Sequence, residues 1–416
     1  MARSYDVLIV GAGHAGAHTA LALRQQDFDG SIALLGDEPE LPYERPPLSK
    51  EFLSGEKPFD RLLIRPAPFW VERNVQVLTG HRVVVVDPIT HSVRTANGET
   101  FGYGRLVWAS GGRPRPLNCP GAEAAGVHSL RSRADAEEIQ RAMTGVQRVV
   151  IVGGGYIGLE VAAALVTKGK SVSVLEARER LLARVAGEAL SRFYEAEHRA
   201  RGVAIQLGAI VDAIETCDGR ATGVRLANGC VLPAEMVVVG IGIDPAVEPL
   251  IAAGAAGSNG VTIDAFARTS LPGVLAVGDC ALHPNPFADG AHVRLESVQN
   301  AVDMAATAAR TIVGDPRPYH AVPWFWSNQF DLKLQTVGLS TGHDQTVVRG
   351  DMSTRSFSVV YLRQGGVIAL DCVNATRDFV QGRTLVAAGA KIEPALLADA
   401  SLPLKQAAAQ APDASV

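Results

Sequence analysis

One short glycine pattern occurs twice in this chain, and it limits the possible folds more than any other feature of the sequence. The first copy is Gly11-Ala-Gly-His-Ala-Gly16, and the second, 142 positions later, is Gly153-Gly-Gly-Tyr-Ile-Gly158. Each copy follows an apolar run and precedes an alanine- and leucine-rich stretch and then a second apolar run. This order of strand, glycine turn, helix and strand is the context in which Gly-x-Gly-x-x-Gly indicates a dinucleotide-binding unit.

Each glycine of the pattern has its own physical task. The first makes a tight turn, the second lets the backbone approach a pyrophosphate, and the third lets the helix pack closely on the strand. The N-terminus of that helix then directs its unpaired N–H groups and partial positive charge at the phosphates. One such pattern can serve packing alone, but two in full context predict two bound dinucleotides and electron transfer between them.

A carboxylate at the end of the second strand of such a unit bonds a ribose hydroxyl of the nucleotide. In the second unit this residue is Glu176, and because a carboxylate repels the 2'-phosphate of NADP, it favours NADH. Arg178 and Arg180 lie close by and weaken this preference. In the first unit the candidate is Asp37, for which an ordinary turn residue is the alternative interpretation.

Composition and charge exclude several other classes of protein. The 416 residues are 47% hydrophobic and 20% charged, with a formal net charge of -4, which is typical of a soluble globular protein of two or three domains. This charge gives no overall field that attracts nucleic acid or an anionic membrane. We find no apolar run long enough for a signal peptide or a membrane span, and we therefore expect a cytoplasmic protein.

Neither the cysteines nor the histidines form a pattern typical of a metal site or a nucleophile. The five cysteines are at least 13 positions apart, which excludes CxxC pairs for redox chemistry or zinc, so we expect reduced thiols and no metal. Four histidines lack a paired carboxylate or nucleophile, and we assign no catalytic role to His14, His283, His292 or His320.

Further strands and turns extend both units. Alternating patterns near 82–101 and 205–232 each contain an Asn-Gly turn, which predicts a hairpin added to each unit. From about residue 321 alternating strands precede a helical stretch at 375–388, which predicts a separate α+β domain. We expect the tail, 405–416, to be disordered. The other strand-like runs are 106–109, 203–207, 237–243, 274–277, 332–337, 356–362 and 367–371.

Five further motifs accompany the two glycine patterns. They are Tyr43-Glu-Arg-Pro-Pro-Leu-Ser-Lys50, Ala109-Ser-Gly111, Val239-Gly-Ile-Gly242, Leu275-Ala-Val-Gly-Asp279 and Pro323-Trp-Phe-Trp-Ser327. With these motifs the chain resembles the FAD- and NADH-dependent ferredoxin reductases of bacterial Rieske-type oxygenases and class I cytochromes P450, the putidaredoxin reductase and biphenyl dioxygenase reductase group. The resemblance extends from residue 5 to about residue 405.

The resemblance implies an α/β fold of the glutathione-reductase-like kind. Two Rossmann-like dinucleotide-binding domains are followed by a C-terminal α+β domain. Carried onto this chain, the FAD-binding domain comprises 1–112 and 244–320, and the NADH-binding domain is inserted into it at 113–243. The C-terminal domain is 321–416 and covers the flavin.

Three residues match the catalytic positions of the family. Lys50 and Glu160 resemble an ion pair beneath the position of hydride transfer, although an exposed Glu160 would be ordinary helix surface. Trp326 resembles the aromatic residue that stacks over the flavin and nicotinamide region, with Trp324 in support. The alternative for both tryptophans is a small hydrophobic core where two domains join.

Other residues match the cofactor contacts of the family. Arg45 resembles a residue along the FAD pyrophosphate, and Arg131 resembles one that reaches FAD across the domain join. Asp279 resembles the carboxylate on the FAD ribityl hydroxyls or beside the pyrophosphate. The alternative for Asp279 is a helix cap. The full set that we assign to cofactor binding is Gly11, Gly13, His14, Ala15, Gly16, Asp37, Arg45, Lys50, Val83, Ala109, Gly111, Arg131, Gly153, Gly155, Tyr156, Ile157, Gly158, Glu160, Glu176, Gly240, Ile241, Gly242, Asp279, Glu296, Ser297, Val298 and Trp326.

In such proteins NADH gives two electrons to FAD as a hydride, and FAD passes them one at a time to a 2Fe-2S ferredoxin. That ferredoxin feeds a P450 or a Rieske-type oxygenase. We expect it to dock by charge complementarity on basic residues of the C-terminal domain. These residues are Lys333, Arg349, Arg355, Arg363, Arg377, Arg383 and Lys391.

Rival activities of the same architecture need cysteines that this chain lacks. A disulfide reductase needs a cysteine pair soon after the first glycine pattern, yet residues 17–118 contain none. An NADH oxidase or peroxidase needs one cysteine near 49–55, which is absent too. A rubredoxin reductase, and a flavoprotein of the apoptosis-inducing-factor type whose assembly NADH controls, remain as alternatives.

Overall fold

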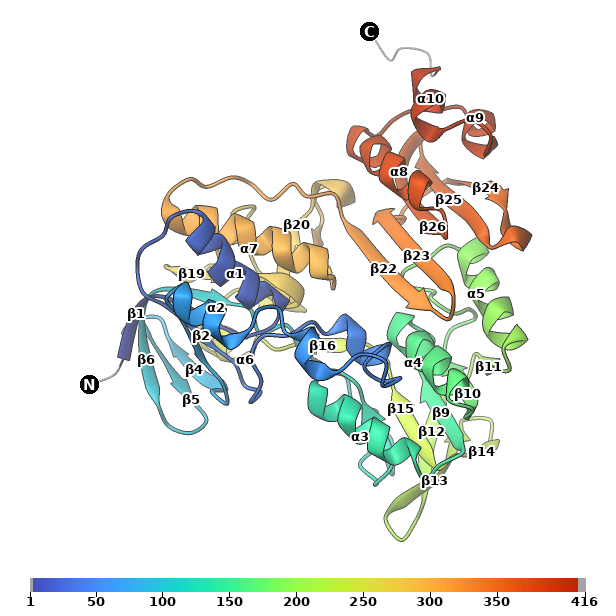
Figure 1. The fold of residues 1–416 in the computed structure, drawn as a ribbon, viewed down its shortest axis with the longest axis horizontal. Coiled ribbons are helices and arrows are strands. Elements are labelled where there is room, and N and C mark those ends of the chain that lie inside the picture. The colour runs from blue at the N-terminus through green and yellow to red at the C-terminus, as the bar shows by residue number, and fades with distance from the viewer. Residues whose placement is uncertain (1–2, 411–416) are drawn as a thin grey trace. The chain divides into compact units, whose positions relative to one another are not determined.

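The computed structural model describes residues 3–410, which form two compact units (Figure 1). Among the described residues, unit 1 comprises 3–45, Phe59–Arg113 and Asp244–Pro323, and unit 2 comprises Pro46–Pro58, Pro114–Ile243 and 324–410. The chain passes between the units at five points, two of which lie within the short strands β7 (Gly112–Pro114) and β16 (Ile243–Pro245).

The main sheet of unit 1 contains the first glycine pattern at the end of its central strand. Its order is β3-β2-β1-β6-β5-β4, with β19 beside β6, and every pair except those of β4 and β5 is parallel. The inner strands are almost continuous runs of buried aliphatic residues, as parallel strands covered on both faces require. The strands are β1 (Arg3–Val10), β2 (Ile32–Leu35), β3 (Val75–Leu78), β4 (Val83–Asp87), β5 (Ser92–Thr95), β6 (Thr100–Trp108) and β19 (Val274–Ala276).

Two alanine-rich helices of unit 1, α1 (His14–Gln25) and α7 (Val298–Val313), lie side by side against this sheet (Figure 1). Small side chains such as Ala17 and Ala308, both fully buried, let the helices approach closely. Two short helices, α2 (Ala67–Glu72) and α6 (Glu248–Ala252), and a small second sheet complete the unit. The strands of that sheet are β17 (Gly257–Ser258), β18 (Gly260–Thr262), β20 (Ala281–Pro284) and β21 (His292–Val293).

Unit 2 contains a second parallel sheet with the order β11-β10-β9-β15-β8 and the second glycine pattern after β9. Its strands are β8 (Val127–Ser129), β9 (Arg148–Val152), β10 (Ser171–Glu176), β11 (Ala204–Leu207) and β15 (Met236–Val239). Its helices are α3 (Arg133–Met143), α4 (Tyr156–Thr167) and α5 (Glu188–Ala200). A three-stranded antiparallel sheet is added, with β12 (Val211–Cys217), β13 (Arg220–Leu226) and β14 (Val231–Pro233).

The remainder of unit 2 is a five-stranded antiparallel sheet with the order β22-β23-β26-β25-β24. Its strands are β22 (Trp324–Gln329), β23 (Leu332–Gly338), β24 (Gln345–Asp351), β25 (Ser356–Arg363) and β26 (Gly366–Val373). Three helices follow, namely α8 (Thr376–Ala388), α9 (Pro394–Ala398) and α10 (Leu404–Ala409). Buried residues of this sheet, including Leu334 and Phe357, share one hydrophobic core with Leu159 and Phe193 of α4 and α5.

The predicted α/β class is confirmed, as are both hairpins and the helix predicted at 375–388. The predicted disorder of the tail is wrong for residues 405–409, which form α10. Leu404 and Ala407, three positions apart, are fully buried on one face of this short helix, which packs on α8. The rest of that prediction, 411–416, lies outside the described residues. The boundaries of three separate domains stay a prediction.

A buried carboxylic acid sits in the core of unit 2. Asp371 of β26 is 4% exposed, and its carboxyl accepts a hydrogen bond of 2.6 Å from the hydroxyl of Tyr361. That hydroxyl in turn accepts the backbone N–H of Gly187 over 3.0 Å. Burial raises the pKa of Asp371 to about 7, although the bond from Tyr361 opposes this shift.

The raised pKa of Asp371 makes stability depend on pH. The folded chain holds this proton up to about pH 7, whereas the unfolded chain releases it near 3.8, the ordinary pKa of an aspartate, so stability falls as the pH rises across this range. An Asp371→Asn variant has no ionisable group at this position, so it does not lose stability in this way as the pH rises. Its free energy of unfolding relative to wild type should therefore gain about 2.5 kcal/mol between pH 5 and pH 8. Melting curves of both proteins across this range test it, and a gap independent of pH would contradict it.

Candidate functional site

In unit 1 the glycine turn after β1 closes tightly against the turn after β6. Gly11 has a φ of +109°, and a Cβ there would lie 2.2 Å from the carbonyl oxygen of Ala109. A Cβ on Gly16 would lie 1.8 Å from the carbonyl oxygen of Gly11. Gly13 is different, because the nearest atom to its Cβ position is the Nε of Arg45, 3.9 Å away. The outer two glycines therefore build the turn, while Gly13 leaves space beside it.

The turn after β9 in unit 2 repeats this geometry. Gly153 has a φ of +113°, and its Cβ would lie 2.4 Å from the carbonyl oxygen of Gly240. A Cβ on Gly158 would lie 2.1 Å from the carbonyl oxygen of Gly153. No described atom lies within 4 Å of the Cβ position of Gly155, so the middle glycine again faces open space.

Both helices that follow these turns begin without a side-chain cap. The N-cap residues are Gly13 for α1 and Gly155 for α4, and neither first turn contains an acidic residue. No side chain therefore caps these two N-termini, and no acidic residue of the first turn compensates their partial positive charge. Open space at the middle glycine together with an uncapped helix N-terminus fits a dinucleotide pyrophosphate at each turn.

The carboxylate predicted for the ribose is in place in unit 2. Glu176 ends β10, and its two carboxylate oxygens accept the backbone N–H groups of Gly154 over 2.8 Å and of Arg178 over 2.9 Å. These bonds hold the carboxylate beside the glycine turn. In unit 1 the corresponding position in the strand register is occupied by Gly36, and Asp37 follows it as an exposed residue.

Arg45 lies beside the open middle glycine of unit 1. Its guanidinium pairs with Glu38 and lies 5.1 Å from the centre of the Tyr43 ring. The Tyr43 hydroxyl also donates to Glu38. This arrangement places a fixed cation next to Gly13, as the predicted contact with a pyrophosphate requires. Glu38 was missed by the sequence analysis, which considered only its neighbour Asp37.

The predicted cofactor contacts Asp279, Glu296, Ser297 and Val298 also lie in unit 1. Gly278, with a φ of +77°, brings the strand end before Asp279 to the first turn of α1, where its Cβ would lie 2.9 Å from that of Ala15. Arg294 donates to the backbone oxygen of Asp279 over 3.0 Å and pairs with Glu296 at 2.7 Å. Ser297 caps α7, of which Val298 is the first residue.

In unit 2 a buried carboxylate accepts hydrogen bonds from three side chains of two segments. Glu160 of α4 is 2% exposed, so the alternative of an ordinary surface residue is wrong. One oxygen accepts the Lys50 ammonium over 2.6 Å and the Ser49 hydroxyl over 2.5 Å, and the other accepts the Ser327 hydroxyl over 2.6 Å. Lys50 also donates to the backbone oxygen of Pro46 over 3.1 Å. This arrangement holds the predicted ion pair in a fixed geometry.

The two tryptophans of β22 lie on one side of the strand, as their spacing predicts. The ring centres of Trp324 and Trp326 are 5.6 Å apart, and Trp324 also meets Phe379 of α8 at 5.9 Å. Between them, Phe325 lies 4.7 Å from the ring of Tyr156 at the start of α4. Trp326 remains partly exposed. Its stacking role stays a prediction.

Three other predicted residues are placed by backbone features. Val83 is buried in the core of unit 1 and pairs with Thr95. The backbone N–H of Arg131 bonds to Asp135 in the capping box of α3 over 2.9 Å. Ile157, in the first turn of α4, is 44% exposed. The remaining predicted residues lie in the turns opposite the two glycine patterns. Gly111 belongs to the turn whose Ala109 lies against Gly11, and Gly242 belongs to the turn whose Gly240 and Ile241 lie against Gly153.

Two family matches cover most of the chain. Residues 5–305 match the pyridine nucleotide-disulphide oxidoreductase family, and residues 324–408 match the reductase C-terminal family. The chain belongs to the pyridine nucleotide-disulphide oxidoreductase family.

Several relatives of high identity are named as ferredoxin reductases. It is 56% identical over 403 residues to the ferredoxin reductase subunit of 5,5'-dehydrodivanillate O-demethylase from Sphingobium sp. strain SYK-6, covering 97% of this chain and 98% of the relative. It is 57% identical over 402 residues to a ferredoxin–NAD(P)+ reductase from a Sphingomonas species, covering 96% and 97%. The solved covalent putidaredoxin reductase–putidaredoxin complex matches with a TM-score of 0.94 at 39% identity, covering 98% of this chain and 99% of that one. The chain is a ferredoxin reductase of this family, with FAD and NAD(P)H as its cofactors.

The cysteines of this reductase form no dithiol among the described residues, although the family is named for disulphides. All five are free, and the first in the sequence is Cys119. Burial raises the pKa of the Cys280 thiol to about 11 and that of Cys372 to about 12, so both stay protonated near neutral pH. No cluster of metal-ligating side chains occurs within residues 3–410. No helix in the same range is long and apolar enough to cross a membrane.

The predicted docking role of Arg349 is wrong. Its side chain is 3% exposed, pairs with Asp378 at 2.9 Å and donates to the backbone oxygens of Leu397, Asp399 and Leu402. These bonds hold the segment after α9 on the sheet, because buried backbone oxygens there need donors. Spacing along the sequence could not separate this inward-facing arginine from the surface cations of the same domain.

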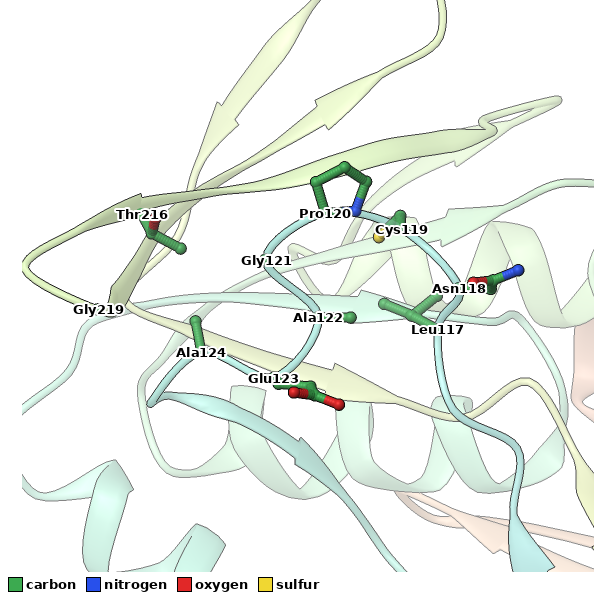
Figure 2. Close-up of a pocket in the computed structure, with 10 residues that line it drawn as sticks. All are labelled: Leu117, Asn118, Cys119, Pro120, Gly121, Ala122, Glu123, Ala124, Thr216 and Gly219. Carbon is green, nitrogen blue, oxygen red and sulfur yellow. The ribbon is translucent and has the colours of Figure 1, made fainter.

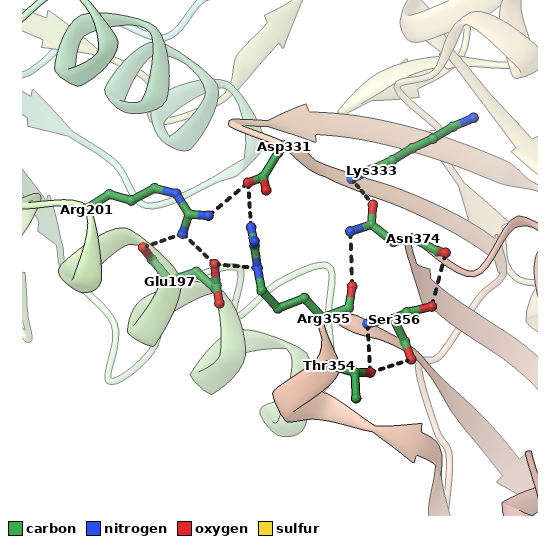
Figure 3. A network of polar contacts seen from close by, with 8 residues as sticks. All are labelled: Glu197, Arg201, Asp331, Lys333, Thr354, Arg355, Ser356 and Asn374. Carbon is green, nitrogen blue, oxygen red and sulfur yellow. Dashed lines mark hydrogen bonds and ion pairs between the residues drawn. The ribbon is translucent and has the colours of Figure 1, made fainter.

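Arg355 is engaged as well, in a network that joins α5 to the turns of the antiparallel sheet (Figure 3). It pairs with Asp331 and with Glu197, and Arg201 pairs with the same two carboxylates. Of the predicted docking residues, the exposed ones are Lys333, Arg377, Arg383 and Lys391. Their contact with a partner stays a prediction.

A surface hollow of unit 2 is separate from the glycine turn (Figure 2). It measures about 710 Å³ and is lined by residues 117–124 together with Thr216 and Gly219. Its lining includes Cys119, whose thiol pKa is raised by burial, and Glu123. It contains no residue of the Lys50–Glu160 group, and we assign it no part in the reaction.

The open space at Gly155 leads to a test of nucleotide binding. A Gly155→Ala variant should fold and hold FAD as wild type does, because the φ of this residue is −81° and its added methyl meets no described atom. The same methyl would stand where the pyrophosphate approaches, so the Kd for NADH should rise at least tenfold, about 1.4 kcal/mol. Fluorescence titration measures this constant.

The matched control for this variant is Gly145→Ala, which also adds a methyl in open space of unit 2 but precedes β9, whereas the glycine turn follows the other end of that strand. We expect it to leave the Kd for NADH unchanged. Equal NADH affinity in both variants would show that the pyrophosphate does not lie against Gly155.

Proposed function

We propose that this ferredoxin reductase takes electrons from NADH in the cytoplasm and passes them through FAD, one at a time, to a 2Fe-2S ferredoxin. The ferredoxin would feed a P450 or a Rieske-type oxygenase. The observation that carries the proposal is the presence of two uncapped glycine turns in a chain whose described cysteines form no dithiol. The names of relatives that serve an O-demethylase and that bind putidaredoxin support it.

We assign FAD to the turn of unit 1. Gly11, Gly13 and Gly16 would receive the pyrophosphate at the N-terminus of α1, and Arg45 would neutralise its charge from the side. Asp279 and the N-terminus of α7 would bind the rest of the cofactor. The corresponding domain would be 1–112 and 244–320, with the NADH-binding domain at 113–243 and the C-terminal domain at 321–416.

We assign NADH to the turn of unit 2. Gly153, Gly155 and Gly158 would receive its pyrophosphate, and Glu176 would accept the ribose hydroxyls. Because the carboxylate is held beside the turn by two backbone N–H groups, it would repel a 2'-phosphate at this place. The side chain of Arg178 is exposed, so solvent and salt screen its charge, and NADH is therefore the preferred nucleotide.

When bound, FAD supplies the conversion between the two-electron chemistry of NADH and the one-electron chemistry of an iron–sulfur cluster. The residues of this chain contribute alignment and charge. Lys50 would present a cation held in direction by Glu160, and a fixed charge in a buried place stabilises developing charge without reorganisation. Trp326 would exclude water with its partly exposed ring.

Anaerobic stopped-flow spectroscopy of the purified yellow protein tests the proposal. NADH should bleach the flavin quickly and NADPH slowly, and a 2Fe-2S ferredoxin from the same cell should then restore the colour within the time of one turnover. If a rubredoxin restores it and the ferredoxin does not, the protein is a rubredoxin reductase. A long-lived reduced complex that neither partner discharges would support a protein of the apoptosis-inducing-factor type instead.

The preference for NADH depends on the charge of Glu176. A Glu176→Gln variant keeps an oxygen acceptor and the size of the side chain but removes the repulsion of a 2'-phosphate. We expect the ratio of kcat/KM for NADH over NADPH to fall about tenfold, which corresponds to about 1.4 kcal/mol. Steady-state assays with both nucleotides measure the ratio.

Glu179→Gln serves as the control, since Glu179 is an exposed residue of the same loop. It removes the same charge a few residues away and should leave the ratio unchanged. If both variants lower the ratio alike, the loop acts by its overall charge and Glu176 has no specific role.

A further inference from the structure

A buried histidine is connected to Glu160 by an unbroken series of hydrogen bonds within unit 2. His198 of α5 is 0% exposed, and its Nε2 lies 2.8 Å from the Oε1 of Gln329. The Nε2 of Gln329 donates to the Ser327 hydroxyl over 3.1 Å. That hydroxyl donates to the Oε1 of Glu160 over 2.6 Å. Ser327 and Gln329, two positions apart in β22, point to the same side of their strand.

All donors in this series point toward the carboxylate. A carboxamide oxygen can only accept, so the proton of His198 must be on Nε2. The amide of Gln329 then donates to Ser327, whose own proton is directed at Glu160. The Nδ1 of His198 is buried and has no partner among the described residues. Burial lowers the pKa of His198, which keeps the ring neutral and the direction of the series fixed.

The outer end of the series is anchored by the turn between β22 and β23. Phe330 adopts a left-handed φ of 54°, which is strained for a bulky residue, and its ring packs 5.1 Å from the His198 ring. The guanidinium of Arg201 lies 4.7 Å from the centre of the Phe330 ring. It also pairs with Asp331 at 2.8 Å (Figure 3). These contacts attach α5 to the turn and hold His198 and Gln329 at bonding distance.

We propose that His198, acting through Gln329 and Ser327, is a positioning residue that fixes the direction of the Glu160 carboxylate. With Oε1 held by Ser327, the other oxygen faces Ser49 and Lys50, so the cation is held where the reaction with NADH needs it. Bonds aligned in one direction polarise one another, and loss of the first one weakens the last. The inference rests on the proposed function for the role of Lys50, and nothing in the family matches assigns a role to His198.

The test removes the donor of His198 while it keeps the volume of the side chain. In a His198→Met variant with FAD bound, the limiting rate constant of flavin reduction at saturating NADH should fall about fivefold, as expected for one lost hydrogen bond. The Kd for NADH should change less than twofold, because the glycine turn and Glu176, to which we assign the nucleotide, are left unchanged by this variant. Stopped-flow absorbance measures both quantities.

Two matched variants separate the hydrogen bond from packing. His198→Gln keeps an N–H donor near the place of Nε2 and should restore the rate constant to within twofold of wild type. Tyr194→Phe alters another fully buried residue of α5 whose hydroxyl has no partner among the described residues, and it should have no effect. If His198→Met reduces as fast as Tyr194→Phe, or if His198→Gln is as slow as His198→Met, the proposal is overturned.

A variant at Gln329 tests the same series of hydrogen bonds if the His198→Met protein does not fold. Gln329→Met keeps the approximate size of the side chain and adds no buried charge, but it removes the N–H that Ser327 receives. It should slow flavin reduction about as much as His198→Met, and a wild-type rate constant would overturn the proposal. Slow reduction of the wild type itself by NADH would instead contradict the proposed function, so the two failures are distinguishable.

Discussion

The burial of the Glu160 carboxylate sets the strongest constraint on unit 2. An ionised side chain taken from water is costly unless donors replace its hydration, and removal of one partner leaves an uncompensated charge. The donors come from residues 49–50 and from strand β22, two segments far apart in the sequence from each other and from helix α4, which carries Glu160. These segments must therefore meet in one register, and the shared hydrophobic core beneath them provides it. A buried ion pair contributes little net stability, so a role in the reaction explains its presence better.

The two glycine turns have the same local geometry in both units. In each unit the first glycine lies against the backbone that follows a neighbouring strand, Ala109 in one case and Gly240 in the other. In each unit the helix begins without a cap and the middle glycine faces open space. The units differ in what lies next to the turn, since unit 1 presents the cation of Arg45 and unit 2 the carboxylate of Glu176. That difference is consistent with two different nucleotides.

Local patterns predicted most of the fold, because strand and helix periodicity and Asn-Gly turns act over a few residues. These patterns gave wrong predictions where contacts between distant parts of the sequence determine the structure. In the tail, Leu404 and Ala407 are buried, and the side chain of Arg349 is buried as well. The motifs contained Lys50 and Trp326, with Glu160 two positions after the second glycine pattern. They also contained Ser49 and Ser327, but nothing in the sequence shows that the hydroxyls of these serines bond to Glu160. Strand alternation places Ser327 opposite Trp326, which was the available signal for an inward-facing serine. His198 and Gln329 are 131 positions apart, and only the folded chain brings them together.

The central claim is that the Lys50–Glu160 pair is retained for the reaction with NADH and not for folding. The most direct measurement is on the double variant Lys50→Met and Glu160→Gln, which replaces the whole charged pair by neutral groups of similar size. The account predicts that the melting temperature of this variant is equal to or above that of wild type. It also predicts that the rate constant of flavin reduction by NADH falls at least tenfold. This fall corresponds to a loss of about 1.4 kcal/mol or more in transition-state stabilisation. A less stable protein that NADH reduces at the wild-type rate would contradict it.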